Sequence, residues 1–404
     1  MIYNTYRRYA QQCVQKENKN ENKIVSNNIN HINQFNQLNQ RFRFIIAGGG
    51  TGGHIFPAIA IADGLKQQQP DCEILFVGAT GRMEMEKVPQ LGYKIIGLEV
   101  VGLQRSLTPK NLLFPFKLLK SLFQAFSVIR DFKPNACIGV GGYASGPVLF
   151  IAALLGKKIF IQEQNSYPGI TNKILSKFAK KIFVAYDNLN AFFDPGKIIL
   201  TGNPVRKDIT EMNPSKQDAL NFFNLDKERK TILIIGGSLG ARTINESIEK
   251  NIDLFTQNGF QLLWQTGKIY HEGIIERTQN LDLTHTRIHQ FIKEMDLAYT
   301  AADLIISRAG ALSISELCLV GKPTVLIPSP NVSEDHQTKN AMALVNKNAA
   351  VLIKDLEAKD KLGEAVLLLM KDNNKLNELS KNIKTLAKTN AANEIVTEII
   401  NQIK

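Results

Sequence analysis

The chain has 404 residues, 44% of them hydrophobic, and a formal net charge of +12; this length exceeds one ordinary hydrophobic core and predicts two domains. The charge favours an anionic partner, either nucleic acid or anionic lipid. The longest apolar run, Val148 to Leu155, is far shorter than the ~20 residues that cross a bilayer. No basic-then-apolar leader begins the chain, and the four cysteines form no CxxC pair, so we expect a cytoplasmic protein with reduced thiols.

Residues 1–40 are rich in Asn, Gln, Lys and Glu and hold too few apolar residues to form a core. We interpret them as a disordered tail, with a partner-binding arm as the alternative. No motif that carries chemistry falls within them.

After the tail, short apolar runs alternate with helix-length segments, in two series separated by TGNPVR at residues 201–206. This alternation predicts an α/β protein with two Rossmann-like, doubly wound domains, residues 41–203 and 204–380, that bind ligands at the carboxyl ends of their strands. Apolar residues at helical spacing also predict a closing helix over residues 374–404. Strands are expected at residues 42–48, 73–79, 136–142, 158–164 and 181–186, and then at 231–237, 260–267, 286–292, 302–310, 322–330 and 349–353.

The first strand runs into a glycine-rich turn in which Gly48, Gly50 and Gly53 match G-x-G-x-x-G. An NAD site also needs a carboxylate where the second strand ends, but that strand ends in FVGAT, so an NAD(P) oxidoreductase is the weaker alternative. The turn instead predicts a helix start that receives an oxygen-rich ligand. His54 stands just inside this helix, either as a local cap or as a general base whose pKa is lowered by the helix N-terminus.

Two further turns repeat this logic in the second domain. GGSLGAR contains Ser238 as a hydroxyl donor, and SRAGALSISEL places small residues before a helix. Ser313 and Glu316 have the spacing of a capping box; alternatively, the helix start binds a diphosphate and Glu316 binds a ribose. Because no Asp-x-Asp pair ends a strand, we expect a diphosphate to leave without a metal or other cofactor, stabilised by backbone N–H groups and the helix dipole.

Residues 106–130 contain more apolar side chains than one helix face can bury. We expect the core stripe to be formed by Leu119, Leu122, Phe123, Phe126 and Ile129. The remaining side chains predict a lysine-rimmed patch that inserts into an anionic leaflet, with a covering loop as the alternative. That patch consists of Leu112, Leu113, Phe114, Phe116, Lys117 and Leu118. The basic residues of the chain show neither aromatic interleaving nor zinc-finger spacing, so nucleic acid is the weaker explanation of the net charge.

Seven motifs together resemble the MurG family of peptidoglycan glycosyltransferases, from about residue 41 to the C-terminus. In order, they are GGGTGGHIFPAIAIA, GVGGYASGP, QEQNSYPGITNK, TGNPVRKDI, GGSLGAR, SRAGALSISE and DHQTKNA. The resemblance implies a GT-B fold, with the helix at residues 381–404 packing back toward the first domain. It also implies transfer of N-acetylglucosamine from UDP-GlcNAc to the muramoyl sugar of lipid I, an undecaprenyl-diphosphate-linked acceptor, at the cytoplasmic face of the plasma membrane. Two alternatives to this function stay open: transfer to another lipid acceptor, such as diacylglycerol, and a non-enzymatic scaffold that binds a nucleotide sugar. Contacts with other cell-wall synthesis proteins are a further possible interaction.

An inverting transfer needs a base for the acceptor hydroxyl, and we assign this role to His54. Glu163 is the runner-up, which is equally interpretable as a buried structural carboxylate. The resemblance assigns the donor-binding roles residue by residue. The implied UDP-GlcNAc-binding residues are Thr51, Gly52, Gly53, Asn165, Arg206, Ser238, Ile292, Ala311, Leu312, Ser313, Ile314, Ser315, Glu316, Gln337 and Asn340.

Overall fold

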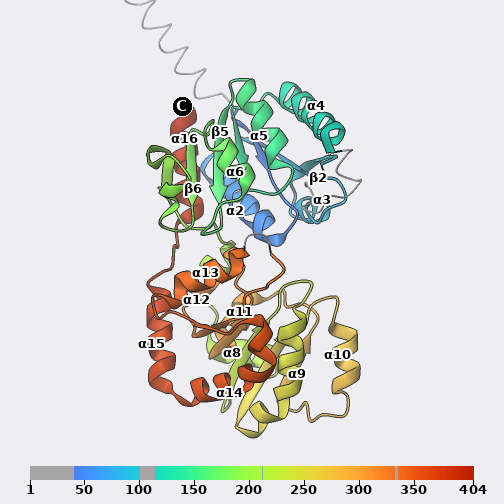
Figure 1. The fold of residues 1–404 in the computed structure, drawn as a ribbon, viewed down its shortest axis with the longest axis vertical. Coiled ribbons are helices and arrows are strands. Elements are labelled where there is room, and N and C mark those ends of the chain that lie inside the picture. The colour runs from blue at the N-terminus through green and yellow to red at the C-terminus, as the bar shows by residue number, and fades with distance from the viewer. Residues whose placement is uncertain (1–40, 101–113, 212, 333–334) are drawn as a thin grey trace, which may run out of the picture.

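The computed structural model describes residues 41–100, 114–211, 213–332 and 335–404. It contains two parallel β-sheets, each flanked by helices, in two domains that meet end to end (Figure 1). The tail predicted for residues 1–40 lies outside the described residues.

The N-terminal sheet has seven parallel strands in the order β3-β2-β1-β4-β5-β6-β7. Its central strands are short apolar runs that are buried on both faces, as is typical of a parallel sheet covered by helices. The strands are β1 (Arg43–Ala47), β2 (Glu73–Ala79), β3 (Lys94–Leu98), β4 (Ala136–Gly139), β5 (Lys158–Glu163), β6 (Lys181–Val184) and β7 (Ile198–Leu200). The helices are α2 (Gly52–Gln68), α3 (Glu84–Gln90), α4 (Phe114–Phe132), α5 (Ser145–Leu154) and α6 (Ile170–Leu175), with short 3-10 turns η2 (Leu189–Ala191) and η3 (Pro195–Lys197).

The C-terminal sheet has six parallel strands in the order β10-β9-β8-β11-β12-β13. Its strands are β8 (Lys230–Ile235), β9 (Phe260–Gln265), β10 (Thr286–His289), β11 (Leu304–Ser307), β12 (Thr324–Leu326) and β13 (Val351–Leu352). Its helices are α7 (Lys207–Thr210), α8 (Lys216–Phe222), α9 (Arg242–Gln257), α10 (His271–Thr278), α11 (Met295–Ala301), α12 (Ala311–Val320), α13 (His336–Val345), α14 (Ala358–Lys371) and α15 (Asn373–Lys384), with the 3-10 turn η5 (Asp355–Glu357).

Two strands were not predicted, and both lie at the edges of the N-terminal sheet. The side chains of β3 are alternately exposed and partly buried along most of its length, and β7 is only three residues long and partly exposed. Both sequences are apolar, KIIGL and IIL, so hydrophobicity does not explain why they were not predicted; their partial exposure follows from their position at the edges of the sheet.

The prediction of one closing helix over residues 374–404 is wrong in its extent, because the chain forms two helices there. α15 packs against α12 and α14 of the C-terminal domain, whereas α16 (Ala391–Ile403) contacts α2 of the N-terminal domain. Ile395, Val396 and Ile399 of α16 are fully buried in the core around β1. Figure 1 shows α16 in red beside the green strands of the other half of the chain.

The segment between α15 and α16 crosses from one domain to the other beside the earlier crossing at residues 201–206. A Cβ atom added to Gly202, whose φ is +86°, would lie 2.5 Å from the Cβ of Lys388. The two crossings therefore touch, and Gly202 is required by both its positive φ and this close approach.

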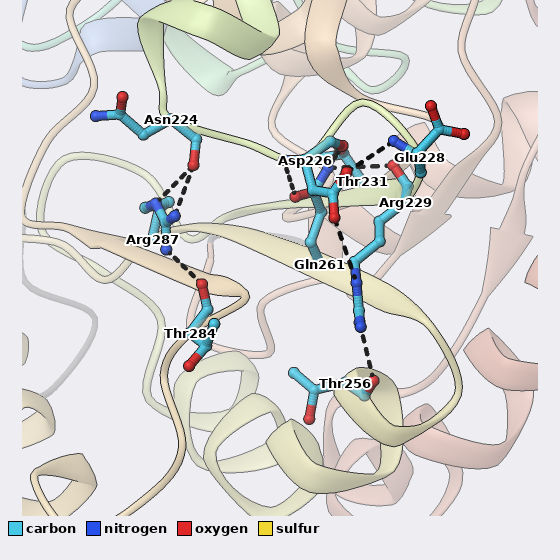
Figure 2. Close-up of polar contacts among 9 residues, drawn as sticks. All are labelled: Asn224, Asp226, Glu228, Arg229, Thr231, Thr256, Gln261, Thr284 and Arg287. Atoms are coloured by element: carbon cyan, nitrogen blue, oxygen red, sulfur yellow. Dashed lines mark hydrogen bonds and ion pairs between the residues drawn. The ribbon is translucent and has the colours of Figure 1, made fainter.

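Polar side chains fasten the amino ends of the strands in the C-terminal sheet (Figure 2). The buried Gln261 accepts a hydrogen bond from the N–H of Asp226 at 2.8 Å and donates to the Asp226 carbonyl at 2.7 Å. Arg287 donates to the carbonyl of Asn224 at 2.6 Å through Nη2 and to that of Thr284 at 2.9 Å through Nη1. This network holds the loop before β8 at the sheet edge opposite the ligand-binding edge expected for the fold.

Helix α4 buries only part of the predicted core stripe: Ile129 is buried and Leu122 partly buried, but the other members of the stripe are exposed. Its fully buried residues are Ser121, Ala125 and Ile129, one turn apart, and the small side chains of the first two let α4 pack closely against α5. By contrast, Phe123 is 74% exposed and Leu119 53% exposed, although the sequence pattern predicts both in the core. The periodicity identifies a helix but cannot decide which of two apolar faces meets the sheet.

The exposed face of α4 therefore carries an apolar stripe, which we call the α4 stripe: Phe116, Leu119, Phe123 and Phe126. Of the predicted patch, Phe116 is 71% and Leu118 40% exposed, and Lys117 is also exposed. Leu112 and Leu113 lie outside the described residues, and Phe114 is the first residue of α4. Within the described residues, no helix is both long and apolar enough to span a bilayer.

Candidate active site

The carboxyl ends of the strands in the two sheets face one another where the domains meet. In each sheet all strands run parallel, so the loops that follow them gather at one edge. Helix α2, which follows β1, contacts α12, which follows β11 (Figure 1). Buried Asn203 also joins the domains, since its Nδ2 donates to the carbonyl of Gln164 at 3.1 Å and to Ser315 Oγ at 3.0 Å.

The first glycine turn brings backbone segments into direct contact. A Cβ on Gly142, in the loop after β4, would lie 2.4 Å from the carbonyl oxygen of Gly49. Gly49 and Gly50 both have positive φ, at +147° and +89°. Thr51 then precedes α2 in an extended conformation, without a side-chain cap and without an acidic residue in the first turn. The N-terminus of α2 thus keeps its positive dipole end uncompensated by a helix cap.

His54 is held by the same turn. Its Nδ1 lies 3.1 Å from the carbonyl oxygen of Gly49 and 3.3 Å from Thr51 Oγ1. A carbonyl can only accept, so Nδ1 carries the proton of the neutral ring and Nε2 is left as the acceptor. Burial lowers the pKa of His54 below 6.5; the contact with Gly49 and the charge of Glu84 oppose this shift, and His336 adds to it. The imidazole is therefore neutral at pH 7, the state that a general base requires.

Glu84 is the side chain bound to the amides of this turn. The carboxylate, only 1% exposed, accepts from the Gly50 N–H at 2.7 Å and from the Ala79 N–H at 2.9 Å. An internal carboxylate thus occupies the amide that a dinucleotide phosphate would use in a Rossmann site. This contact argues against the oxidoreductase alternative. The N–H groups of Gly52 and Gly53 lie at the start of α2, where a helix has no intrahelical acceptor for its first N–H groups.

Glu163, the runner-up base, is bound on both oxygens. Its Oε1 accepts from the Asn165 N–H at 3.0 Å, and its Oε2 accepts from Asn172 Nδ2 at 2.8 Å and from the Gly169 N–H at 3.2 Å. Burial raises its pKa and these hydrogen bonds oppose the rise. The geometry favours the structural interpretation of Glu163, as the residue that shapes the loop carrying Asn165.

Asn165 and Asn340, two of the residues implied to bind the sugar, meet across the domain interface. Asn340 is fully buried, and its Nδ2 lies 3.4 Å from Asn165 Oδ1. Its Oδ1 accepts from both the N–H and the hydroxyl of Ser166, at 3.1 and 3.0 Å. The next residue, Tyr167, places its ring 3.8 Å from Lys339 Nζ and 6.2 Å from the His336 ring. The loop after β5 and helix α13 therefore form one interdomain contact.

Arg206 and Glu316 also lie together, at the start of the C-terminal domain. Arg206 Nε is 3.6 Å from Glu316 Oε1, and the guanidinium carbon lies 5.6 Å from the Phe56 ring of α2. The Tyr299 hydroxyl donates to Glu316 Oε2 at 3.0 Å. This arrangement brings a cation and an acceptor carboxylate to the helix that the resemblance assigns to diphosphate and ribose.

The capping-box interpretation of Ser313 and Glu316 is wrong. α12 begins at Ala311 with Gly310 as its N-cap and no side-chain cap, so Ser313 stands at N3 and not at the N-cap that a capping box requires, and Glu316 lies a further turn inside the helix. The first N–H groups of α12 are consequently left for a ligand. Leu312 and Ile314 are buried in the core, so only their backbone could contact one.

The other residues implied to bind the donor lie in two loops and one helix. Ser238 is exposed in the turn before α9, where its carbonyl accepts from the Lys268 N–H at 3.0 Å. Ile292 is buried, and its N–H donates to Gln265 Oε1 at 2.9 Å. Gln337 Oε1 accepts from the N–H groups of Ala309 and Ser329, at 3.2 and 2.8 Å. This fixes the amide orientation and turns its NH₂ group outward from those contacts.

Four residues of the site were not predicted: Glu84, Asn203, Tyr167 and His336. Asn203, Tyr167 and His336 stand within motifs that the sequence displays, but their contacts depend on the approach of the two domains. Glu84 follows β2 by five residues in GRMEMEK, and no local pattern connects it with the first glycine turn. The only available signal was an acidic residue at the start of the short helix that follows β2.

Comparison with known proteins gives consistent matches over both domains. Residues 44–184 match the glycosyltransferase family 28 N-terminal domain, and residues 231–395 match the family 28 C-terminal domain. A relative from Flavobacterium psychrophilum is 53% identical over 90% of this chain and 99% of its own length. One from Parabacteroides distasonis is 54% identical over 89% of this chain and 98% of its own length. Both are named UDP-N-acetylglucosamine--N-acetylmuramyl-(pentapeptide) pyrophosphoryl-undecaprenol N-acetylglucosamine transferase.

Among solved structures, the crystal structure of Acinetobacter baumannii MurG matches with a TM-score of 0.71 and 28% identity, covering 89% of this chain and 99% of that one. The GT-B arrangement expected from the sequence is thereby confirmed. With both domain models matched and more than half of all aligned positions identical to full-length relatives, the chain belongs to glycosyltransferase family 28 and, within it, to the MurG transferases.

Proposed function

We propose that this protein transfers N-acetylglucosamine from UDP-GlcNAc to the muramoyl sugar of lipid I, forming lipid II for peptidoglycan synthesis and hence for cell shape and division. The reaction is an inverting substitution: the acceptor hydroxyl forms a new bond to the anomeric carbon while UDP leaves from the opposite face. The observation that carries the proposal is the contact of α2 with α12. This contact brings two groups to one site. Neutral His54 lies at the uncapped N-terminus of α2, and Arg206 lies beside Glu316 of α12.

The departing diphosphate gains negative charge, which the N-terminus of α12 and the Arg206 guanidinium stabilise. Ser238 adds a hydroxyl donor, and Thr51 closes over the phosphates from the other domain with the amides of Gly52 and Gly53. Preorganised N–H groups and a cation can supply this stabilisation without a metal ion.

The nucleoside and the sugar are held by separate groups. Glu316 accepts hydrogen bonds from the ribose hydroxyls, and the backbone of Ile292 contacts the uracil. The NH₂ group of Gln337 and the side chains of Asn165 and Asn340 contact the sugar. Asn165 Oδ1 and Asn340 Nδ2 lie 3.4 Å apart, so one bound sugar can contact both side chains.

His54 takes the proton from the attacking hydroxyl at Nε2. The Nδ1–H contact with Gly49 supports this role, since it fixes the tautomer that leaves Nε2 free to accept. A positioned base contributes typically 10²–10⁴-fold to rate.

The acceptor is lipid-linked, and we place the enzyme at the cytoplasmic face of the plasma membrane as a peripheral protein. Support comes from the α4 stripe, whose phenylalanines Phe116 and Phe123 are 71% and 74% exposed, and from the net charge of +12. Apolar insertion and attraction to anionic lipid act together in such binding.

The decisive test is release of UDP from UDP-GlcNAc, measured with a lipid I analogue, with diacylglycerol and without acceptor. We expect UDP and the disaccharide product only with the lipid I analogue. Turnover with diacylglycerol instead would assign the chain to another acceptor, and binding of UDP-GlcNAc without turnover on either lipid would contradict an enzymatic role.

A further inference from the structure

We infer that Glu84 is the positioning residue for His54 and acts through the peptide group between Gly49 and Gly50. The inference rests on the proposed role of His54 as the base. It adds a residue on another helix, α3, that holds the imidazole in its working tautomer without touching substrate.

The contacts form a continuous chain. Glu84 Oε2 accepts from the Gly50 N–H at 2.7 Å. The carbonyl of the same peptide group, that of Gly49, lies 3.1 Å from His54 Nδ1. One peptide unit thus binds the carboxylate on its N–H side and the imidazole on its C=O side.

The surrounding backbone is shaped to admit this carboxylate. A Cβ on Gly49 would lie 2.2 Å from Glu84 Cδ, and one on Gly78 of β2 would lie 2.5 Å from Glu84 Cγ. The second oxygen is anchored on the Ala79 N–H at 2.9 Å. With 1% of the residue exposed, the charge of Glu84 is directed at the peptide group and not at solvent.

Two effects on His54 follow. A carboxylate bound to an amide N–H polarises the peptide, so its carbonyl becomes a stronger acceptor for Nδ1–H. When Nε2 takes the proton of the acceptor hydroxyl, the imidazolium that forms is stabilised by the nearby negative charge; Glu84 itself neither gains nor loses a proton. His336, on α13 across the domain interface, acts in the opposite direction on the pKa of His54, whereas Glu84 raises it.

The test is Glu84→Gln, which preserves the side-chain shape and removes the charge. We expect kcat to fall about 10-fold or more, a part of the 10²–10⁴-fold that the base contributes, with UDP affinity unchanged within about 2-fold because Glu84 does not touch the donor. The acid limb of the kcat/KM profile should move to lower pH, because loss of the negative charge lowers the pKa of His54 further. ¹⁵N NMR should show Nδ1–H in the native protein at neutral pH and a mixture of tautomers in the variant.

Glu86→Gln is the matched control, since Glu86 is exposed on the same helix and its substitution removes the same charge without touching the turn. If the native His54 is the Nε2–H tautomer, the inference is overturned. It is also overturned if Glu84→Gln has the same tautomer as the native protein and the same acid limb in its kcat/KM profile. A variant that loses UDP affinity and kcat in parallel, with the tautomer intact, indicates a purely structural role and also overturns it. If Glu84→Gln does not fold, the native spectrum still allows refutation.

His54→Ala, assayed in parallel, separates this inference from the proposed function. Retention of kcat within a few-fold in His54→Ala would refute His54 as the base. A large loss there, combined with a silent Glu84→Gln, would refute only the role of Glu84.

Discussion

At the scale of single residues, the neutral state of His54 determines how activity should depend on pH. Its pKa in the folded protein is lowered below 6.5, mainly by burial, and only the unprotonated ring can accept the hydroxyl proton. We expect kcat/KM to be constant as pH falls from 8 toward 7 and to decline only below about 6.5, the ordinary value for histidine. A profile already falling between pH 8 and 7 would show a base of higher pKa and contradict this assignment.

Gly141 provides a second prediction at this scale, because it lies against the Nε2 edge of the His54 imidazole. A Cβ there would be 2.8 Å from His54 Nε2 and 2.7 Å from Cδ2, and φ is +90°. We expect Gly141→Ala to displace the ring and lower kcat by about 100-fold, within the contribution of a general base.

Gly156→Ala is the control for Gly141→Ala, since Gly156 has a φ of +66° and a Cβ added there would meet no atom within 4 Å. Both variants carry the left-handed backbone cost of roughly 1–2 kcal/mol, which thermal unfolding would measure. Equal activity in the two variants would show that contact with His54 is unimportant.

At the scale of secondary-structure elements, α4 illustrates how far a periodic pattern can be trusted. Apolar residues lie on more than one face of this helix, so spacing alone predicts a helix but not its orientation. Ser121 and Ala125 decide the orientation because their small side chains permit the closest approach to α5, and this leaves the larger phenylalanines outside.

The α4 stripe predicts a specific membrane defect. Phe116→Ser combined with Phe123→Ser should weaken binding to vesicles containing anionic lipid by at least about 10-fold, since burial of each side chain is worth about 1.5–3 kcal/mol. Co-sedimentation measures the binding, and raising the salt concentration should weaken it further.

Leu356→Ser combined with Leu368→Ser is the matched control, because these leucines are 93% and 63% exposed in the C-terminal domain. This control should bind vesicles as the native protein does. Equal loss in both pairs, or no loss in either, would remove the α4 stripe from the membrane contact.

At the scale of the whole molecule, the interface between domains is where the implied sugar-binding residues lie. Asn340→Ala removes two acceptor contacts to Ser166 and the donor contact to Asn165. We expect KM for UDP-GlcNAc to rise about 10-fold, as for loss of one or two buried hydrogen bonds of about 1–3 kcal/mol. We also expect kcat to fall, because the contacts that align the two domains are weakened.

Asn346→Ala serves as the control, since Asn346 is exposed at the C-cap of α13. Steady-state kinetics against UDP-GlcNAc compares the two variants. An unchanged KM in Asn340→Ala would mean that this residue joins the domains without contacting the donor.

The sequence alone determined the two α/β domains, the central strands and the family, because these depend on local apolar runs, glycine turns and motifs that are contiguous in the chain. It also named His54, since a histidine at a glycine-rich helix start is visible locally. Only the tertiary structure decided which face of α4 is buried, that the closing segment forms two helices, and that Glu163 is bound within its own loop. It alone joined Glu84 to His54 and Asn340 to Asn165, residues 30 and 175 positions apart, because such contacts arise from chain crossings and domain packing, and no local spacing encodes them.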